Sequence, residues 1–190
     1  ELKEGLATDW KVSDDGLTYT LTLREGVKFH DGSDFNAEAV VYNFTRWASG
    51  DKEKYYYYNS QFGDVITDVK AENSTTVVIT TSRPIAPFFK NLAMSPFAIA
   101  SPKALKEAGD DFGSKVVVGT GPFVFKEWKA NETITLDKNP DYWKEGLPKL
   151  DKVIFEVIPD NAARFNALQA GEVDIIEGIN YSDLPTIEAN

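Results

Sequence analysis

A mixed α/β fold, with antiparallel hairpins beside helices, is the fold class that the sequence predicts. Three observations favour it. Residues 18–24, TYTLTLR, alternate β-forming side chains with the period of a strand. Two further pairs of strand-like segments are each separated by only a short turn. Near the end of the chain, a strand, a helix and another strand follow in the order of a βαβ unit.

The composition narrows the class of protein. The 190 residues suffice for one domain or one elaborated lobe, and a net charge of −10 disfavours nucleic acid or anionic lipid as a partner. The absence of cysteine excludes disulfides, thiolate metal sites and cysteine nucleophiles. No apolar run approaches the roughly 18 residues of a membrane span. No signal peptide is visible, and neither "ELKEGLATDW" nor "DLPTIEAN" reads as a natural terminus, so we expect a piece of a longer protein.

A helix is predicted directly after the glycine-containing segment 26–35. Asn36 is a suitable N-cap, Glu38 lies in the first turn, and Gly50 ends the helix. The apolar residues at helical spacing, which we expect to face the core, are Ala37, Val40, Val41, Phe44 and Trp47 with Ala48.

Two hairpins follow along the chain. Residues 64–73 and 75–81 are expected to pair around Asn73 and Ser74. Residues 122–128 and 132–138 are expected to pair across a turn at 129–131. A short helix between them is predicted to begin at Pro102 and to stop at Gly109.

The final third predicts a βαβ unit. KVIFEVI, residues 152–158, is almost continuously apolar, as in a strand buried on both faces. Asp160 should cap a helix that buries Ala163, Phe165 and Leu168 and is closed by Gly171. EVDII, residues 172–176, should then form a second buried strand.

The only histidine, His30, lies in "GVKFHDGSDF", residues 26–35. A hydrolase would need a nucleophile beside it, and no G-x-S-x-G elbow is present. A zinc site normally requires several His or Cys ligands. A tight turn, with Gly32 at positive φ, is therefore the favoured interpretation, with ligand contact and catalysis as alternatives.

"GTGPF", residues 119–123, is only superficially similar to a phosphate-binding loop. A P-loop needs Gly-Lys-Ser/Thr at a set spacing, and Pro122 removes a backbone donor. We interpret the segment as a close backbone approach that leads into a strand.

"YYYYNSQF", residues 55–62, is the first candidate ligand-binding segment. Consecutive tyrosines in one regular element face different directions, so some must present their rings to solvent or to a ligand. Tyrosine combines apolar area with a polar tip, which suits recognition surfaces. The candidate residues are Tyr55, Tyr56, Tyr57, Tyr58 and Asn59.

The second candidate segment follows the predicted strand 172–176. Ligands of open α/β sheets bind beyond the carboxyl ends of the strands, and a glycine there permits close approach of the backbone. The candidate residues are Glu177, Gly178, Ile179, Asn180 and Tyr181, with an ordinary loop or hinge as the alternative.

Several strings together resemble family 5 of the extracellular solute-binding proteins of ABC importers, the peptide/nickel class. They are "GLATDWKVSDDGLTYTLTLREGVKFHDGSDFNAEAVVYNFTRW", "RPIAPFFKNLAM", "VGTGPFVFKEWKANETITLDKNPDYW" and "LDKVIFEVIPDNAARFNALQAGEVDII". They occur in the family's order and cover essentially the whole chain. "RPIAPFFKNLAM" is similar to the dipeptide-binding branch.

The resemblance implies a periplasmic-binding-protein-like fold of type II (cluster C), of which this chain would be the first lobe of a two-lobed clamp. It implies a main mixed-sheet subdomain from residues 1–24 and 116–180, and an inserted hairpin and helix subdomain at 25–115. Residues 181–190 would begin the crossover to the second lobe. The lobe would lack its own opening strand.

The implied function is that of a bacterial receptor, not an enzyme, with no cofactor. It would capture di- or oligopeptides between its lobes and deliver them to the transmembrane subunits of an ABC permease. Its location would be the periplasm or a lipid-anchored position at the cell surface, with no other membrane contact. In this family, the first lobe would contribute aromatic side chains from 55–62 and backbone from 177–181, whereas His30 would be part of a turn. The isolated lobe would expose the surface between the lobes and would self-associate.

Three alternatives remain open at this point. The family also suggests another solute, such as a nickel chelate, an oligosaccharide or an opine. A hydrolase that uses His30 is a remote alternative from another class. A scaffold without a ligand is the third.

Overall fold

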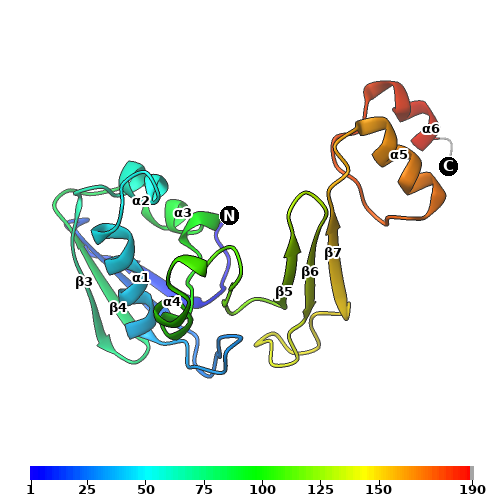
Figure 1. Cartoon of the computed structure of the whole chain (residues 1–190). Coiled ribbons are helices and arrows are strands. Elements are labelled where there is room, and N and C mark those ends of the chain that lie inside the picture. Colours follow the sequence, from blue (N-terminus) through cyan, green and yellow to red (C-terminus); the bar gives the residue numbers. More distant parts are fainter. Residues whose placement is uncertain (189–190) are drawn as a thin grey trace.

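An antiparallel four-stranded sheet in the order β1-β2-β4-β3 forms the first part of the computed structural model, which describes residues 1–188 (Figure 1). Its strands are β1 (Ala7–Val12), β2 (Thr18–Leu23), β3 (Ile66–Asn73) and β4 (Thr76–Thr81). The registers Tyr19↔Ile79 and Leu21↔Val77 place the apolar residues of β2 and β4 on one face, because residues opposite each other in a sheet share a face. That face is the floor of the core.

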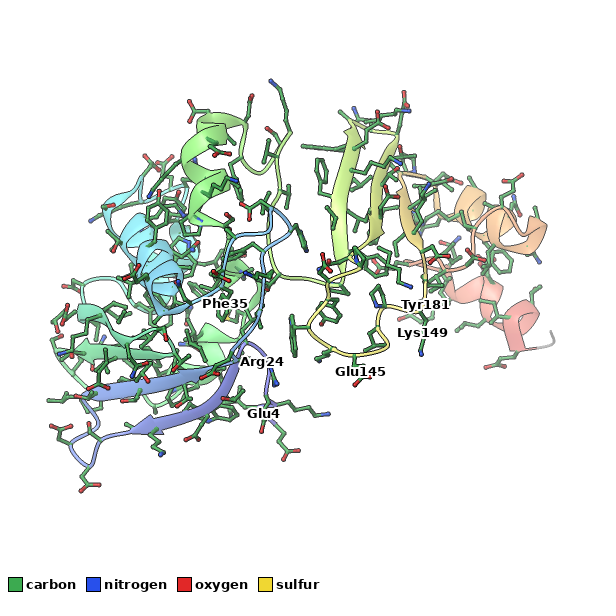
Figure 2. The ribbon with its side chains drawn as sticks, turned by 90° about the horizontal axis from the view of Figure 1, so that it is seen from below. Glu4, Arg24, Phe35, Glu145, Lys149 and Tyr181 are labelled. Atoms are coloured by element: carbon green, nitrogen blue, oxygen red, sulfur yellow. The ribbon has the colours of Figure 1, made fainter. Side chains whose placement is uncertain are left out.

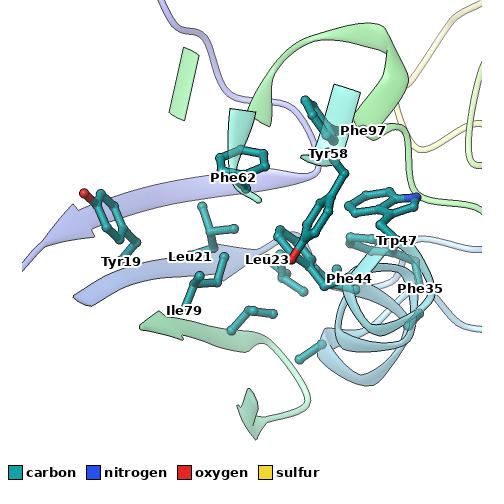
Figure 3. Packing of buried hydrophobic residues seen from close by; sticks show 14 of the residues in the cluster. Tyr19, Leu21, Leu23, Phe35, Phe44, Trp47, Tyr58, Phe62, Ile79 and Phe97 are labelled. Carbon is teal, nitrogen blue, oxygen red and sulfur yellow. The ribbon is translucent and has the colours of Figure 1, made fainter. Parts of the chain in front are cut away.

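Helices cover this apolar face with aromatic rings, as Figure 3 shows. They are α1 (Ala37–Ser49), α2 (Tyr56–Gln61) and α3 (Phe88–Leu92). Phe44 and Trp47 of α1 are buried against Tyr58 of α2, and Phe62 lies 5.2 Å, centroid to centroid, from Phe88. Short elements at Ser95–Phe97, α4 (Pro102–Ala108) and Gly109–Asp111 complete this part.

The predicted caps of α1 are confirmed. The Asn36 side chain accepts a hydrogen bond of 2.9 Å from the Ala39 amide, Glu38 lies in the first turn, and Gly50 follows the last residue. Val41 and Ala48 differ from the expectation, since Val41 is only half-buried and Ala48 is exposed. The buried stripe of α1 is therefore narrower than its apolar pattern.

A second antiparallel sheet, in the order β5-β6-β7, follows the first (Figure 1). It contains β5 (Phe123–Lys129), β6 (Thr133–Lys138) and β7 (Lys152–Glu156). The predicted β5–β6 hairpin is confirmed, with Asn131 at φ 61° in its turn. Beyond β7 lie α5 (Asn161–Ala170), a 3-10 turn at Tyr181–Asp183 and α6 (Leu184–Glu188).

The prediction that 152–158 is buried on both faces is wrong. Ile154 and Phe155 are 52% and 55% exposed, and β7 is the last strand of its sheet. A continuous apolar run indicates a buried strand only when other elements cover both faces; Ile154 and Phe155 point to opposite faces, and the described residues cover neither face fully.

The predicted second strand of the βαβ unit is also absent. Residues 172–176 form no strand, and Ile175 is 85% exposed. Strand geometry depends on a neighbour that pairs the backbone N–H and C=O groups, and no described strand pairs with these residues. The predicted helix after Asp160 is confirmed, with Asp160 as N-cap and Gly171 at φ 73° after its end. Its predicted buried residues are not: Ala163 is exposed, Phe165 and Leu168 are half-buried, and Ala167 is buried instead.

The predicted division into subdomains places the first strands in the wrong sheet. β2 pairs with β4, inside the segment 25–115, and β1 pairs with β2, so neither strand joins the sheet of the segment 116–180. Hydrogen-bond pairing between distant segments decides this, and local patterns do not encode it. Residues 181–188 of the predicted crossover form the 3-10 turn and α6, and residues 189–190 lie outside the described part.

The two sheets are connected by a cation–π contact. The Arg24 guanidinium lies 4.7 Å from the centroid of the Trp143 ring, in the loop between β6 and β7. Arg24 also donates to the Gly5 carbonyl at 3.0 Å and pairs with Glu4 at 3.5 Å. Figure 2 shows Arg24 beside Glu4, facing the loop that carries Glu145. No helix within residues 1–188 has the length and hydropathy needed to cross a membrane.

Candidate functional site

The first predicted segment, Tyr55 to Asn59, places its side chains in three different environments. Tyr58 is only 4% exposed, and its ring contacts Phe44, Trp47 and Phe62 (Figure 3). Burial raises the pKa of its phenol, because the low-dielectric core disfavours the phenolate. Tyr58 is therefore a core residue and not part of a ligand-facing surface.

Tyr55 packs against the last turn of α1. Its ring lies 5.4 Å from the Arg46 guanidinium, and Arg46 Nη1 donates to its hydroxyl at 3.3 Å. A Cβ on Gly50 would lie 2.1 Å from this ring, so glycine is required there. These residues border a cavity of about 330 Å³ with Tyr42, Thr45 and Ser49.

Tyr56 and Tyr57 face solvent, with exposed fractions of 63% and 51%. Their ring centroids lie 5.7 Å apart in an edge-to-face arrangement, so the two phenol rings together form one exposed amphipathic surface. Asn59 turns back onto its own helix and donates to the Tyr55 carbonyl at 3.0 Å. Of the five residues, Tyr56 and Tyr57 are the ones available to a partner.

The second predicted segment, Glu177 to Tyr181, is an exposed loop beside α5. The carbonyls of Glu177 and Gly178 accept hydrogen bonds from Arg164 at 2.9 and 3.3 Å. Asn180 bonds Asn161 at 3.1 Å through its side-chain oxygen. Ile179 is 39% exposed and Tyr181, labelled in Figure 2, is 92% exposed, so both side chains are available to a ligand.

The structure does not bring the two predicted segments together. Figure 1 shows α2 above the first sheet and the α5–α6 region beyond β7, at opposite ends of the chain's arrangement. A peptide that contacts both would have to lie along the second sheet. The two segments are therefore separate candidate surfaces.

Within residues 1–188, the hydrogen bonds of His30 all go to backbone groups, in agreement with the predicted turn. Its amide donates to the Gly119 carbonyl at 2.9 Å, and its Nε2 hydrogen-bonds the Gly121 carbonyl at 3.0 Å. The Gly119 amide lies 3.4 Å from Nδ1, which fits the tautomer with the proton on Nε2. Both ring nitrogens hold the "GTGPF" segment, so neither is free for acid–base work.

Asp31, next to His30, fixes the same turn from the other side. Its carboxylate accepts hydrogen bonds from Ser101 Oγ at 2.6 Å, from Ser33 Oγ at 2.5 Å and from the Ser33 amide at 3.0 Å. Partial burial raises the pKa of this carboxyl, but the bonds from Ser101 and Ser33 outweigh burial and hold the pKa below its ordinary value. The carboxylate is a structural acceptor that stays charged.

An apolar groove is the feature that the sequence reasoning missed. It has a volume of about 410 Å³ and runs between the N-terminal segment, α1 and the segment that contains α3. None of the ten predicted residues borders it. "PFFKNLAM", bracketed by prolines, was the available signal, since it is too apolar for an exposed loop. The lining includes Leu6, Trp10, Phe35, Phe89, Met94 and Phe97.

This groove suits apolar side chains better than charged ones. Met94 is 38% exposed at its rim, and a flexible thioether adapts to ligands of different shape. Within residues 1–188 no group of three His, Cys, Asp or Glu side chains is placed to hold a metal ion.

Comparison with protein families gives a match over residues 1–190 to the model described as bacterial extracellular solute-binding proteins, family 5 middle. Among curated relatives, the glutathione-binding protein GsiB of Salmonella typhi is 38% identical over 192 aligned positions. The match covers 100% of this chain and 36% of that relative, so the chain spans little more than a third of its length.

Two solved structures of this kind contain bound peptides. The periplasmic binding protein DppA of Helicobacter pylori, in complex with the peptide STSA, is 34% identical with a TM-score of 0.89. The dipeptide-binding protein of Pseudoalteromonas sp. SM9913, in complex with Met-Leu, is 26% identical with a TM-score of 0.93. Both cover 100% of this chain, which covers 40% and 41% of those chains.

Proposed function

The chain belongs to family 5 of the bacterial extracellular solute-binding proteins, which are transport receptors and not enzymes, and we propose that it forms part of the peptide-binding lobe of an ABC importer's receptor. Its fold is the mixed α/β, periplasmic-binding-protein-like fold of that family. The protein would work outside the cytoplasm, in a periplasm or at the cell surface on a lipid anchor, and would deliver its ligand to the permease subunits of the transporter.

One observation carries the proposal of a peptide ligand. Over its whole length, the chain is similar to a protein whose solved structure contains the peptide STSA. The relative GsiB is named for glutathione, which is itself a tripeptide. The exposed pair Tyr56 and Tyr57 and the loop 177–181 supply surfaces of the amphipathic kind that peptides use.

Binding in such a receptor is a conformational transition. A ligand that contacts two lobes in the closed state, and one in the open state, shifts the population towards closure. A single lobe makes only part of the contacts, so we expect the 190-residue chain alone to bind peptides weakly.

Native mass spectrometry of the natural full-length protein tests the proposal. The protein is measured as purified and again after partial denaturation, and the released ligands are identified. Masses that match one or more short peptides support the proposal. If the released ligand is instead a nickel chelate, an opine or an oligosaccharide, the protein is a family 5 receptor for that solute and not for peptides.

A thermal-shift measurement completes this test. A tight ligand present at about 100 times its Kd stabilises the folded state by about 2.7 kcal/mol. If no peptide co-purifies and no peptide pool raises the unfolding midpoint, peptide binding is contradicted and the family assignment still stands.

A further inference from the structure

Arg164 in α5 makes more hydrogen bonds than a surface helix position requires. Its guanidinium reaches five acceptors, which are the carbonyls of Ile158, Pro159, Glu177 and Gly178 and the side-chain oxygen of Asn161. The distances to Ile158 and Pro159 are 2.5 and 3.0 Å. Guanidinium is a planar fork with several fixed donors, so one side chain can bind carbonyls from two chain segments.

The two segments that Arg164 joins are the exit from β7 and the loop after α5. Ile158 and Pro159 lie between β7 and the N-cap Asp160, whereas Glu177 and Gly178 begin the second candidate segment. The side chain of Asn180 adds two further contacts to that segment: it accepts a hydrogen bond of 3.1 Å from Asn161, next to the N-cap Asp160, and it donates to Asp183 at 3.3 Å.

Beyond these bonds, the Asn180 carbonyl accepts a hydrogen bond of 3.0 Å from the Asp183 amide, which ties the end of the loop only to the turn that follows it. Within the described residues, the backbone N–H groups of Ile175 to Asn180 donate to no protein acceptor. Ile175 and Tyr181 are 85% and 92% exposed, so packing does not order the loop either. A loop with few buried contacts opens locally at low cost unless specific hydrogen bonds restrain it.

Gly178 shows how closely Arg164 approaches the loop. Its φ is +68°, and a Cβ placed on it would lie 2.9 Å from Arg164 Nη2. Gly171, at the other end of the same connection, has a similar φ of +73° but nothing within 4 Å of such a Cβ. A side chain at position 178 would therefore be strained by the positive φ and would collide with Arg164. A side chain at position 171 would meet only the strain of the positive φ.

We propose that Arg164 is a positioning residue for ligand binding: it holds the Glu177–Tyr181 loop in the conformation that presents its free N–H groups and the Tyr181 ring to the peptide. This inference rests on the proposed peptide function. With the carbonyls of Glu177 and Gly178 occupied by Arg164, the loop offers donors, which complement the carbonyl or carboxylate oxygens of a peptide.

Limited proteolysis of the full-length protein tests the positioning role without any ligand. A chymotrypsin-type protease cleaves after exposed aromatic residues, here after Tyr181 and, as an internal control, after Tyr57. Losing several charge-assisted hydrogen bonds in Arg164→Met should raise the rate of cleavage after Tyr181 about tenfold and leave cleavage after Tyr57 unchanged. Gln169→Met, an exposed change in the same helix, should alter neither rate.

A double-mutant comparison isolates the contact itself. Gly178→Ala should raise cleavage after Tyr181 more when Arg164 is present than in the Arg164→Met background, since the collision is then gone and only the strain of the positive φ remains. Gly171→Ala should have the same effect in both backgrounds.

Peptide affinity links the loop to function. The probe is the peptide STSA or a pool of di- to tetrapeptides, measured by calorimetry with unfolding midpoints recorded in parallel. Arg164→Met should weaken binding about tenfold at an unchanged midpoint, and Arg164→Lys should restore part of it, since a single ammonium reaches fewer carbonyls.

The outcomes separate this inference from the proposed function. Unchanged cleavage after Tyr181 in Arg164→Met overturns the positioning role, whatever binds. Faster cleavage with unchanged peptide affinity shows that the loop is not ligand-facing and also overturns it. No peptide binding by the wild-type protein overturns the proposed function, and the ligand part of this inference with it.

Discussion

Neighbouring side chains of α2 differ in what they contact, so equal substitutions should have unequal effects. Tyr58→Ala removes a buried ring from an aromatic cluster and should lower the free energy of unfolding by about 3–5 kcal/mol. Tyr57→Ala, one position away and 51% exposed, should change it by less than about 0.5 kcal/mol. Chemical denaturation of both variants checks this, and equal losses would contradict the burial of Tyr58.

Asp31 makes a pH-dependent contribution to stability. Its pKa is below the ordinary value of 3.8, because the hydrogen bonds from Ser101 and Ser33 outweigh the effect of burial. A depressed pKa stabilises the folded state above the ordinary value, and this stabilisation is lost as the pH falls through the lower pKa of the folded state. Asp31→Asn should therefore be less stable than wild type at about pH 6, with the difference narrowing towards about pH 3.

Thermal unfolding across this pH range provides the measurement for Asp31. Asp14→Asn is the matched control, since the structure gives Asp14 no hydrogen bond or ion pair within residues 1–188. A wild-type advantage over Asp31→Asn that stayed constant down to about pH 2 would refute the assigned role.

Helices α1 and α5 have similar N-caps but different tertiary support. Asn36 caps a helix whose Val40, Phe44 and Trp47 lie in the core, whereas Asp160 caps a helix with only Ala167 buried. Asn36→Ala should lower the global free energy of unfolding by about 1 kcal/mol, because α1 unfolds with the whole core. Asp160→Ala should instead destabilise α5 locally.

Hydrogen exchange distinguishes these two effects at the level of the element. In Asp160→Ala, amides of Ala163 to Ala170 should exchange faster while the global unfolding midpoint stays constant. Asn36→Ala should shift the midpoint itself. A global shift of equal size in both variants would mean that α5 is part of the main cooperative unit.

At the scale of the whole molecule, the second sheet has too little cover for its apolar residues. Ile154 and Phe155 of the edge strand β7 are more than half exposed, and an exposed apolar edge strand pairs readily with other chains. The 190-residue chain should therefore self-associate at micromolar concentration, more strongly at high salt, which screens the repulsion of its net charge of −10.

Sedimentation velocity of charged variants checks where this association takes place. Phe155→Lys should shift the population towards monomer. Val12→Lys, which replaces a 47% exposed apolar residue on the edge strand of the other sheet, should leave association unchanged. If Val12→Lys reduced association and Phe155→Lys did not, the associating surface would lie on β1 and not on β7.

The sequence by itself determined the features that depend on near neighbours in the chain. The alternation in TYTLTL, the side-chain cap of Asn36 and the turns of both hairpins are local, because each rests on contacts within a few residues. The family was also readable from ordered strings of residues, and the receptor function followed as what the family implies. The His30 turn was predicted from Gly32 and its polar neighbours.

Only the tertiary structure decided the features that depend on distant partners. Which tyrosine of α2 enters the core, which sheet receives β1 and β2, and what the His30 ring holds are all settled by contacts across tens of residues. The apolar run at β7 and the segment 172–176 were misread for the same reason, since burial and strand pairing belong to the neighbours and not to the segment. Arg164 looked like an ordinary helix residue, and only the folded chain brings both of its carbonyl segments within reach of one guanidinium.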